Sequence, residues 1–288
     1  MAINWFPGHM HKARKEIKKV MPQMDLIIEV LDARLPFSSE NPLVPSLRGD
    51  TPLIKVLNKR DLADPDVTAQ WQAWLENERG VKAVTLTHNQ RSEALDILRL
   101  ATEMAPGHDR QKSALRVMIL GIPNVGKSTL INTLAGRPAA KTGNEPAVTR
   151  AQQAIKLPHN ILLYDTPGFL WPKLSPDACG YRLAISGAIR SAVIEFEDVA
   201  LFAADYLLDA YPAQVLERYG LDQRPVDGLA LMDAIAEKRR FLGRGGVPDL
   251  HKVAEVLLNE LRAGKLGRIS LETPAIIERE TREAQENS

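Results

Sequence analysis

The chain has 288 residues, of which 44% are hydrophobic and 25% are charged, the composition of an ordinary globular protein of about two domains. Its formal net charge of +1 gives no overall attraction to nucleic acid, and its single cysteine, Cys179, excludes an internal disulfide and fits a reducing compartment. There is no signal-peptide pattern and no run of about 18 apolar residues that could cross a membrane, so we expect a cytoplasmic protein.

Short apolar runs alternate with helical patterns through the first two thirds of the chain. This alternation predicts strands joined by crossover helices in a mostly parallel sheet, the α/β class. The expected strands are 26–31, 53–57, 83–86, 115–120, 154–157 and 161–164, and the expected helices are 65–78, 92–104 and 127–134. Glycine, proline and polar residues predict loops at 105–113 and 136–150.

After about residue 176 the strand patterns end, and apolar residues recur at three- and four-residue spacing. This periodicity predicts helices at 181–194, 198–211, 228–242 and 250–264. We therefore expect an α/β domain over residues 1–175, which begins with a basic segment at 1–20, and a small helical domain over residues 176–288. The polar tail at 278–288 is expected to be frayed or disordered.

The first motif in chain order is NKRD, residues 58–61, which directly follows the expected strand 53–57. The Asp61 carboxylate can accept hydrogen bonds from N1–H and the 2-amino group of guanine together, whereas the Lys59 stem covers the base plane and Asn58 ties neighbouring loops. The motif indicates guanine recognition, and a charged turn after a strand is the simpler alternative. The loop Thr85–Asn89 is only a degenerate candidate for the remaining guanine contact.

The second motif is GIPNVGKS, residues 121–128, which matches the phosphate-binding pattern G-x-x-x-x-G-K-S between an expected strand and an expected helix. Its glycines let backbone N–H groups wrap a phosphate at the positive end of the helix. Lys127 would neutralise the β- and γ-phosphates, and Ser128 would ligate magnesium (Mg2+). The residues expected to contact the nucleotide here are Asn124, Val125, Gly126, Lys127, Ser128 and Thr129.

Two further segments are expected to complete the phosphate side. DTPG, residues 165–168, ends the expected strand 161–164, so that Asp165 would hold magnesium through a water molecule and the Gly168 N–H would meet the γ-phosphate. Thr149 lies in the polar loop between the two motifs and is the candidate switch threonine, with its hydroxyl and carbonyl on magnesium and γ-phosphate. A plain turn and an ordinary loop threonine are the alternatives.

These motifs form the usual set of a GTPase in a rotated order, with base recognition ahead of phosphate binding. A doubly wound domain tolerates rotation because its termini can lie close together. The chain resembles the circularly permuted GTPases, and within them the ribosome biogenesis GTPase A (YlqF-type) family. Besides the motifs above, the resemblance rests on the segments WFPGHMHKA, DAR, DTPGFLWPK and GYRLAISGAI. It implies a circularly permuted P-loop GTPase domain and a GTP-hydrolysing factor for late assembly of the large (50S) ribosomal subunit, whose helical domain contacts ribosomal RNA.

The position after DTPG bears on how GTP is hydrolysed. Many GTPases place a water-orienting glutamine there, whereas this chain has Phe169, so we expect slow intrinsic hydrolysis or another catalytic group. Asn124 resembles the asparagine of potassium-dependent GTPases, which makes K+ an expected cofactor beside Mg2+. His9 is a second candidate, because an imidazole titrates near neutral pH and can position water. Packing roles remain open for both residues.

Two basic clusters are candidate RNA contacts. Residues 12–19 contain five basic and one acidic residue, a net charge of +4, and residues 238–268 contain eight basic and three acidic residues, a net charge of +5. Such clusters can pair with phosphate, although a solvated helix face is the plain alternative. Because aromatic residues make up only 5% of the chain, recognition of RNA shape and backbone is favoured over base stacking.

The rotated order also suggests how the nucleotide could act on RNA. The DTPG strand runs directly into the helical domain, so contacts at Gly168 could bias that domain's orientation. We expect a monomer that binds the large-subunit precursor and its rRNA and binds no membrane. The alternative function is a GTP-binding RNA placeholder with negligible turnover.

Overall fold

The structure is a computed structural model that describes residues 17–87, 90–105, 108, 112–140, 153–166, 168, 170–171, 175–189 and 195–286. In this part of the chain, six strands form one sheet in the order β3-β2-β1-β4-β6-β5. Their bounds are β1 (Leu26–Asp32), β2 (Leu53–Asn58), β3 (Val81–Leu86), β4 (Leu115–Gly121), β5 (Gln153–Leu157) and β6 (Ile161–Asp165).

All neighbouring strands are parallel except the antiparallel pair β5 and β6. The predicted strands are therefore confirmed to within two residues at each end, and the mostly parallel α/β class is confirmed. β1 and β2 are buried along their whole length, which explains why both read as near-continuous apolar runs.

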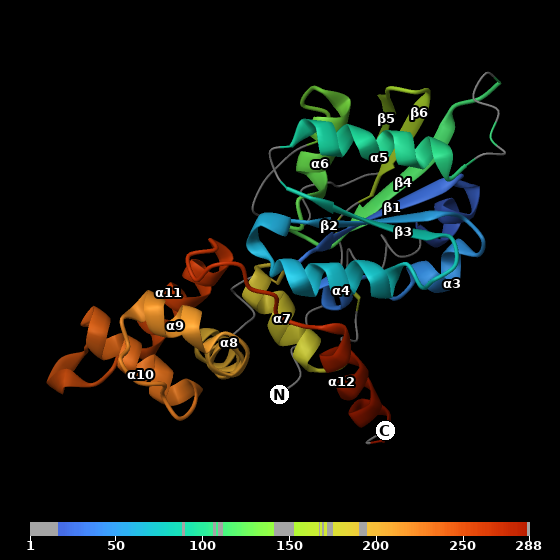
Figure 1. The fold of residues 1–288 in the computed structure, drawn as a ribbon. Coiled ribbons are helices and arrows are strands. Elements are labelled where there is room, and N and C mark those ends of the chain that lie inside the picture. Colours follow the sequence, from blue (N-terminus) through green and yellow to red (C-terminus); the bar gives the residue numbers. More distant parts are fainter. Residues whose placement is uncertain are drawn as a thin grey trace.

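Helices cover both faces of the sheet. Figure 1 shows α5 and α6 together on one face and α4 on the opposite face. Their bounds are α2 (Pro36–Ser39), α3 (Val44–Arg48), α4 (Pro65–Leu75), α5 (Arg91–Glu103) and α6 (Lys127–Ala135), and short 3-10 turns lie at Met21–Gln23, Arg60–Leu62 and Arg244–Gly246. α4 starts where the Asp64 carboxylate accepts hydrogen bonds from the backbone N–H groups of Asp66 and Val67, with Pro65 at the first helical position.

The second half of the chain is helical, as predicted. Its helices are α7 (Ala178–Ser186), α8 (Phe196–Ala210), α9 (Pro212–Tyr219), α10 (Gly228–Arg239), α11 (Leu250–Arg262) and α12 (Pro274–Glu286). Figure 1 shows α8 to α11 grouped together beside the sheet domain, with α7 between the two groups. α7 is shorter than the predicted 181–194 because Gly187 adopts a left-handed conformation with φ of 82° and ends the helix. The boundary at residue 175 stays a prediction.

The expectation of a frayed tail was wrong for residues 278–286, which lie in helix α12. α12 packs against α4, and Ile277 is buried in the cluster that contains Trp71 of α4. Glu280 forms two hydrogen bonds of 2.6 and 2.8 Å with the guanidinium of Arg182 in α7. The helix was not predicted because its sequence is mostly polar. Only one apolar side chain, Ile277, and one ion pair, Glu280 with Arg182, connect it to the rest of the protein in the contacts described above.

The segment that leads back from the helical group to α12 crosses the edge of the sheet domain. We call residues 268–273 the return strap. The N–H of Ile269 donates to the carbonyl of Leu62 at 2.9 Å, and the N–H of Leu271 donates to the carbonyl of Arg34 at 2.6 Å. The chain therefore contacts the sheet domain again after the helical group. Among the described residues no helix is both long and apolar enough to span a membrane.

Candidate functional site

The predicted motifs meet at the carboxyl edge of the parallel strands. NKRD begins at the last residue of β2, the phosphate-binding segment runs from the last residue of β4 into α6, and DTPG begins at the last residue of β6. Since β1 and β4 are central neighbours in the sheet, the ends of these strands converge at one place.

One hydrogen bond joins the two motifs whose order is rotated. The side-chain amide of Asn58 donates to the carbonyl of Val125 at 2.7 Å, across 67 residues of chain. Next to this bond Gly126 has a φ of +96°, and a Cβ built on it would lie only 2.2 Å from the Asn58 amide nitrogen. Glycine is required here both by the backbone conformation and by the close approach of Asn58.

Lys127 and Asp165 form a buried ion pair at the start of α6. Both side chains are almost fully buried, with exposed fractions of 6% and 2%. Burial lowers the pKa of the Lys127 ammonium, and the neighbouring Asp165 carboxylate opposes that shift. The cation predicted to meet phosphate and the carboxylate predicted to meet magnesium are thus in direct contact.

The DTPG segment lies against the phosphate-binding loop. The hydroxyl of Thr166 donates to the carbonyl of Ile119 in β4 at 2.8 Å. A Cβ built on Gly168 would lie 3.4 Å from the backbone nitrogen of Pro123. The backbone at Gly168 is therefore packed closely on the loop.

Asn124 has an arrangement that the sequence did not predict. Its backbone is left-handed, with φ of 59°, and its side-chain amide donates to the carbonyl of Gly187 at 2.8 Å. Gly187 is the residue that ends α7. The phosphate-binding loop is therefore in direct contact with the start of the helical half.

The Lys59 side chain is bonded to Asp32, the last residue of the neighbouring strand β1. Its backbone is left-handed, with φ of 63°, and its ammonium donates to the carboxylate of Asp32 at 2.9 Å. Asp32 also accepts two hydrogen bonds from the Arg34 guanidinium, at 2.8 and 2.9 Å. Sequence reasoning used the DAR segment only as a mark of the family and missed this contact. The only signal in the sequence is that Asp32 and Asn58 each come directly after an expected strand.

Asp61 is exposed and borders a hollow of about 340 Å³. Thr85 and Thr87, from the degenerate loop predicted to complete base recognition, line the same hollow, as does Arg268 of the return strap. His88 and Asn89 of that loop lie outside the described residues, as do His9, Thr149 and Phe169. The roles predicted for these residues stay predictions.

The oxygen donors at the phosphate end fit Mg2+. The ion binds oxygen ligands, and in phosphate sites it takes only one or two from the protein. Ser128 stands in the first turn of α6, and Asp165 ends β6 beside Lys127. Within the described ranges no cluster of three or more His, Cys, Asp or Glu side chains could hold a metal ion.

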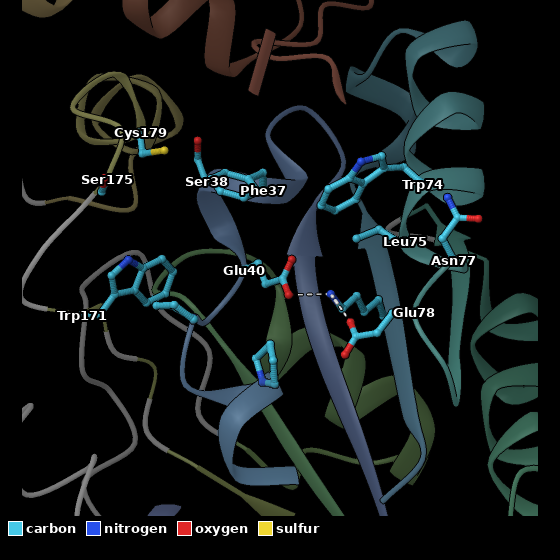
Figure 2. A pocket seen from close by; sticks show the side chains of 13 residues that line it. Phe37, Ser38, Glu40, Trp74, Leu75, Asn77, Glu78, Trp171, Ser175 and Cys179 are labelled. Carbon is cyan, nitrogen blue, oxygen red and sulfur yellow. Dashed lines mark hydrogen bonds and ion pairs between the residues drawn. The ribbon is translucent and has the colours of Figure 1, made fainter. Parts of the chain in front are cut away.

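A larger hollow of about 670 Å³ lies apart from these motifs. Figure 2 shows Trp171 and Cys179 on one side of it, Trp74 on the other, and Glu40 and Glu78 at its base. At that base the Lys55 ammonium donates to Glu40 at 2.6 Å. Burial raises the pKa of the Cys179 thiol to about 12, so this cysteine is not a reactive thiolate at neutral pH.

Comparison with known proteins agrees with this geometry. The family described as "50S ribosome-binding GTPase" matches residues 116–227, a range that begins in β4 and leaves NKRD outside it. The chain is 42% identical to "Ribosome biogenesis GTPase A" of Priestia megaterium over 283 residues, which cover 96% of this chain and 98% of that protein. It is 30% identical over 272 residues to the protein of the same name in Thermotoga maritima, covering 94% and 95%. The crystal structure of GNP-bound YlqF from T. maritima superposes with a TM-score of 0.64 at 27% identity, covering 92% of this chain and 100% of that one.

Proposed function

This chain belongs to the ribosome biogenesis GTPase A family and is therefore a GTPase that acts in 50S subunit assembly; on this basis we propose which residues bind GTP and how the nucleotide controls RNA binding. The observation that carries the proposal is the hydrogen bond from Asn58 to Val125. It joins the NKRD motif to the phosphate-binding loop, which supports the proposal that both segments bind one nucleotide.

At the base end, Asp61 accepts from guanine and the Lys59 stem covers the ring. An exposed carboxylate beside a hollow lined by Thr85 and Thr87 supports this assignment. Because adenine would leave the Asp61 carboxylate without its two donors, the site selects guanine.

At the phosphate end, backbone N–H groups from Asn124 to Thr129 and the Lys127 ammonium hold the β- and γ-phosphates. The Lys127 pair with Asp165 supports this, because it places the cation and the magnesium-side carboxylate next to each other. Ser128, Asp165 and Thr149 would hold Mg2+, with Asp165 acting through water, and Gly168 would donate its N–H to the γ-phosphate. Bound Mg2+ supplies positive charge that stabilises the phosphate oxygens during transfer.

For hydrolysis, we assign potassium binding to Asn124 and keep His9 as the candidate that positions water. The place of Asn124 in the phosphate-binding loop supports its role, and Lys127 contributes charge beside it. Phe169 has no group that could orient water, so intrinsic turnover is slow and the ribosomal particle accelerates it.

For RNA, the basic residues of the helical group are the proposed contacts. Seven of the eight basic residues in 238–268 are exposed: Lys238, Arg239, Arg240, Arg244, Lys252, Lys265 and Arg268. The eighth, Arg262, is half-buried and donates to the carbonyls of Ala184 and Ile185 in α7. It joins α11 to α7 and is not a proposed RNA contact. In the N-terminal cluster, Lys18 and Lys19 are exposed, and residues 12–16 lie outside the described ranges. We place the protein in the cytoplasm as a monomer.

Co-sedimentation tests this function. The protein is mixed with mature small subunits, mature large subunits and immature large subunits, with GDP or with a non-hydrolysable GTP analogue, while phosphate release is followed in parallel. A GTP-switched factor binds immature large subunits more tightly with the analogue and hydrolyses GTP faster on them. The alternative, an RNA-bound placeholder, binds the particle with no stimulation of phosphate release.

A further inference from the structure

We propose that Asp32 is a positioning residue for guanine binding: it fixes the Lys59 side chain over the base, and the return strap holds the backbone of its partner Arg34. The inference rests on the assignment of Lys59 and Asp61 to the base site made above. It adds to that site a residue from another strand and a segment from the far end of the chain.

Asp32 is placed for this role by the sheet. It is the last residue of β1 and is paired in register with Asn58, the last residue of β2. Only 1% of its side chain is exposed. One carboxylate oxygen accepts a hydrogen bond from the Lys59 ammonium at 2.9 Å and another from a guanidinium nitrogen of Arg34 at 2.8 Å. Although burial opposes ionisation, the neighbouring Arg34 and Lys59 hold the pKa of Asp32 below its ordinary value, so the carboxylate is charged at neutral pH.

Lys59 needs such an anchor. Its four-carbon stem is flexible, and its ammonium is strongly hydrated when it is free in solution. With the backbone fixed at φ of 63° at one end and the ammonium fixed by Asp32 at the other, the stem is restricted to a narrow range of positions. A stem held in this way is preorganised to cover a planar base, which reduces the entropy lost on binding.

Arg34 connects Asp32 to Asp61, the second residue assigned to the base site. Its guanidinium is 2% exposed, and its Nη1 nitrogen has no partner among the described residues. Although burial lowers the pKa of Arg34, Asp32 outweighs that effect and Asp61 adds to the upward shift. Arg34 thus lies in the electrostatic reach of Asp61 while it is bonded to Asp32.

The return strap fastens the two loops that carry these residues. Leu271 donates its N–H to the carbonyl of Arg34 at 2.6 Å, and Ile269 donates its N–H to the carbonyl of Leu62 at 2.9 Å. Between them, the hydroxyl oxygen of Ser270 accepts the N–H of Asp64 at 3.2 Å. The strap therefore bonds first to the segment that follows NKRD, through Ile269 and Ser270, and then to the DAR loop, through Leu271. It comes from the helical group that is proposed to bind RNA.

The test compares Asp32→Asn with Glu40→Gln. Both changes remove a carboxylate charge that a lysine bonds directly, and the Lys55–Glu40 pair lies at the base of the larger hollow, outside the base site. The Kd for a fluorescent GDP is measured for each full-length variant, together with kcat and KM for GTP and the melting temperature. Asp32→Asn is expected to raise both Kd and KM about tenfold, because the negative charge that holds the Lys59 ammonium is lost, and to leave kcat unchanged. Glu40→Gln is expected to leave Kd, KM and kcat at wild-type values.

A third variant, Asp61→Asn, separates this inference from the proposed site. If Asp61→Asn binds GDP like wild type, the base-site assignment itself fails. If Asp61→Asn loses GDP affinity while Asp32→Asn keeps it, only the role of Asp32 is overturned. An equal rise of KM in Glu40→Gln would also overturn it, since the effect would then be a general loss of stability. Should Asp32→Asn not fold, the double variant Asp32→Asn with Arg34→Met removes the unpaired buried charge and is expected to show the same tenfold rise.

Discussion

The side-chain amide of Asn124 donates a hydrogen bond of 2.8 Å to the carbonyl of Gly187, so the phosphate-binding loop is bonded to the end of helix α7. The same end of α7 is also bonded to Arg262 of α11, which donates to the carbonyls of Ile185 and Ala184 at 2.7 and 2.8 Å. α7 therefore has hydrogen bonds both to the phosphate-binding loop and to the helical group.

Asn124 is predicted to make hydrolysis depend on potassium. An amide oxygen next to the phosphates can ligate K+, which then supplies positive charge in the transition state. Phosphate release by the wild type should be roughly tenfold faster in KCl than in NaCl of equal concentration, a difference that Asn124→Ala should remove. Asn132→Ala, in the middle of α6, is the matched control and should keep it. Equal wild-type rates in the two salts would refute the assignment.

Asp61 is predicted to determine the choice of base. Xanthine carries an oxygen where guanine carries the 2-amino donor, so an asparagine, which has both a donor and an acceptor, matches xanthine and mismatches guanine. Asp61→Asn should lower kcat/KM for GTP by about 100-fold or more and raise kcat/KM for XTP. The exposed Asp66→Asn serves as the control. Unchanged selectivity in Asp61→Asn would remove Asp61 from the base site.

Much of the nucleotide site could be predicted from sequence because its motifs are local. NKRD and GIPNVGKS each begin at the last residue of a strand whose apolar run is buried in the sheet. The apolar runs therefore predicted the strands, and the motifs at their ends predicted where the site lies. The contacts from Lys59 to Asp32 and from Asn124 to Gly187 join residues 27 and 63 positions apart, and no local pattern encodes them. Helix α12 was missed for a related reason, since the Arg182 partner of Glu280 is 98 residues away.

Glu29 is predicted to make stability fall as pH rises. Complete burial, with Glu40 nearby, raises the pKa of Glu29 to about 8, above the unfolded value of about 4.3. Between these values the folded state keeps a proton that the unfolded state has lost, so the free energy of unfolding falls by up to about 1.4 kcal/mol per pH unit. The stabilisation is complete below the unfolded pKa and is lost as the pH passes through 8.

Replacing Glu29 should remove this dependence. Glu29→Gln keeps the oxygen that accepts the Asn41 N–H at 2.7 Å but cannot ionise. Urea denaturation at pH about 5 and about 9 should therefore show a smaller loss of stability in Glu29→Gln than in wild type. Glu217→Gln, which alters an exposed side chain, should behave as wild type. A wild-type stability that does not change between the two pH values would contradict the prediction.

We propose that GTP at this site controls attachment to the immature large subunit. Two links connect the site to the helical group: α7 through Asn124, and the return strap through Arg34 and Leu62. We propose that a difference in nucleotide contacts at either link would change the affinity for RNA, and RNA would then change the affinity for the nucleotide by the same factor.

The most direct measurement is the affinity for immature large subunits with a non-hydrolysable GTP analogue and with GDP, by co-sedimentation at a fixed salt concentration. Typical coupling free energies of about 1–3 kcal/mol predict binding that is roughly 5- to 150-fold tighter with the analogue. The same particles should accelerate phosphate release from GTP. Equal affinity in the two nucleotide states would contradict the claim.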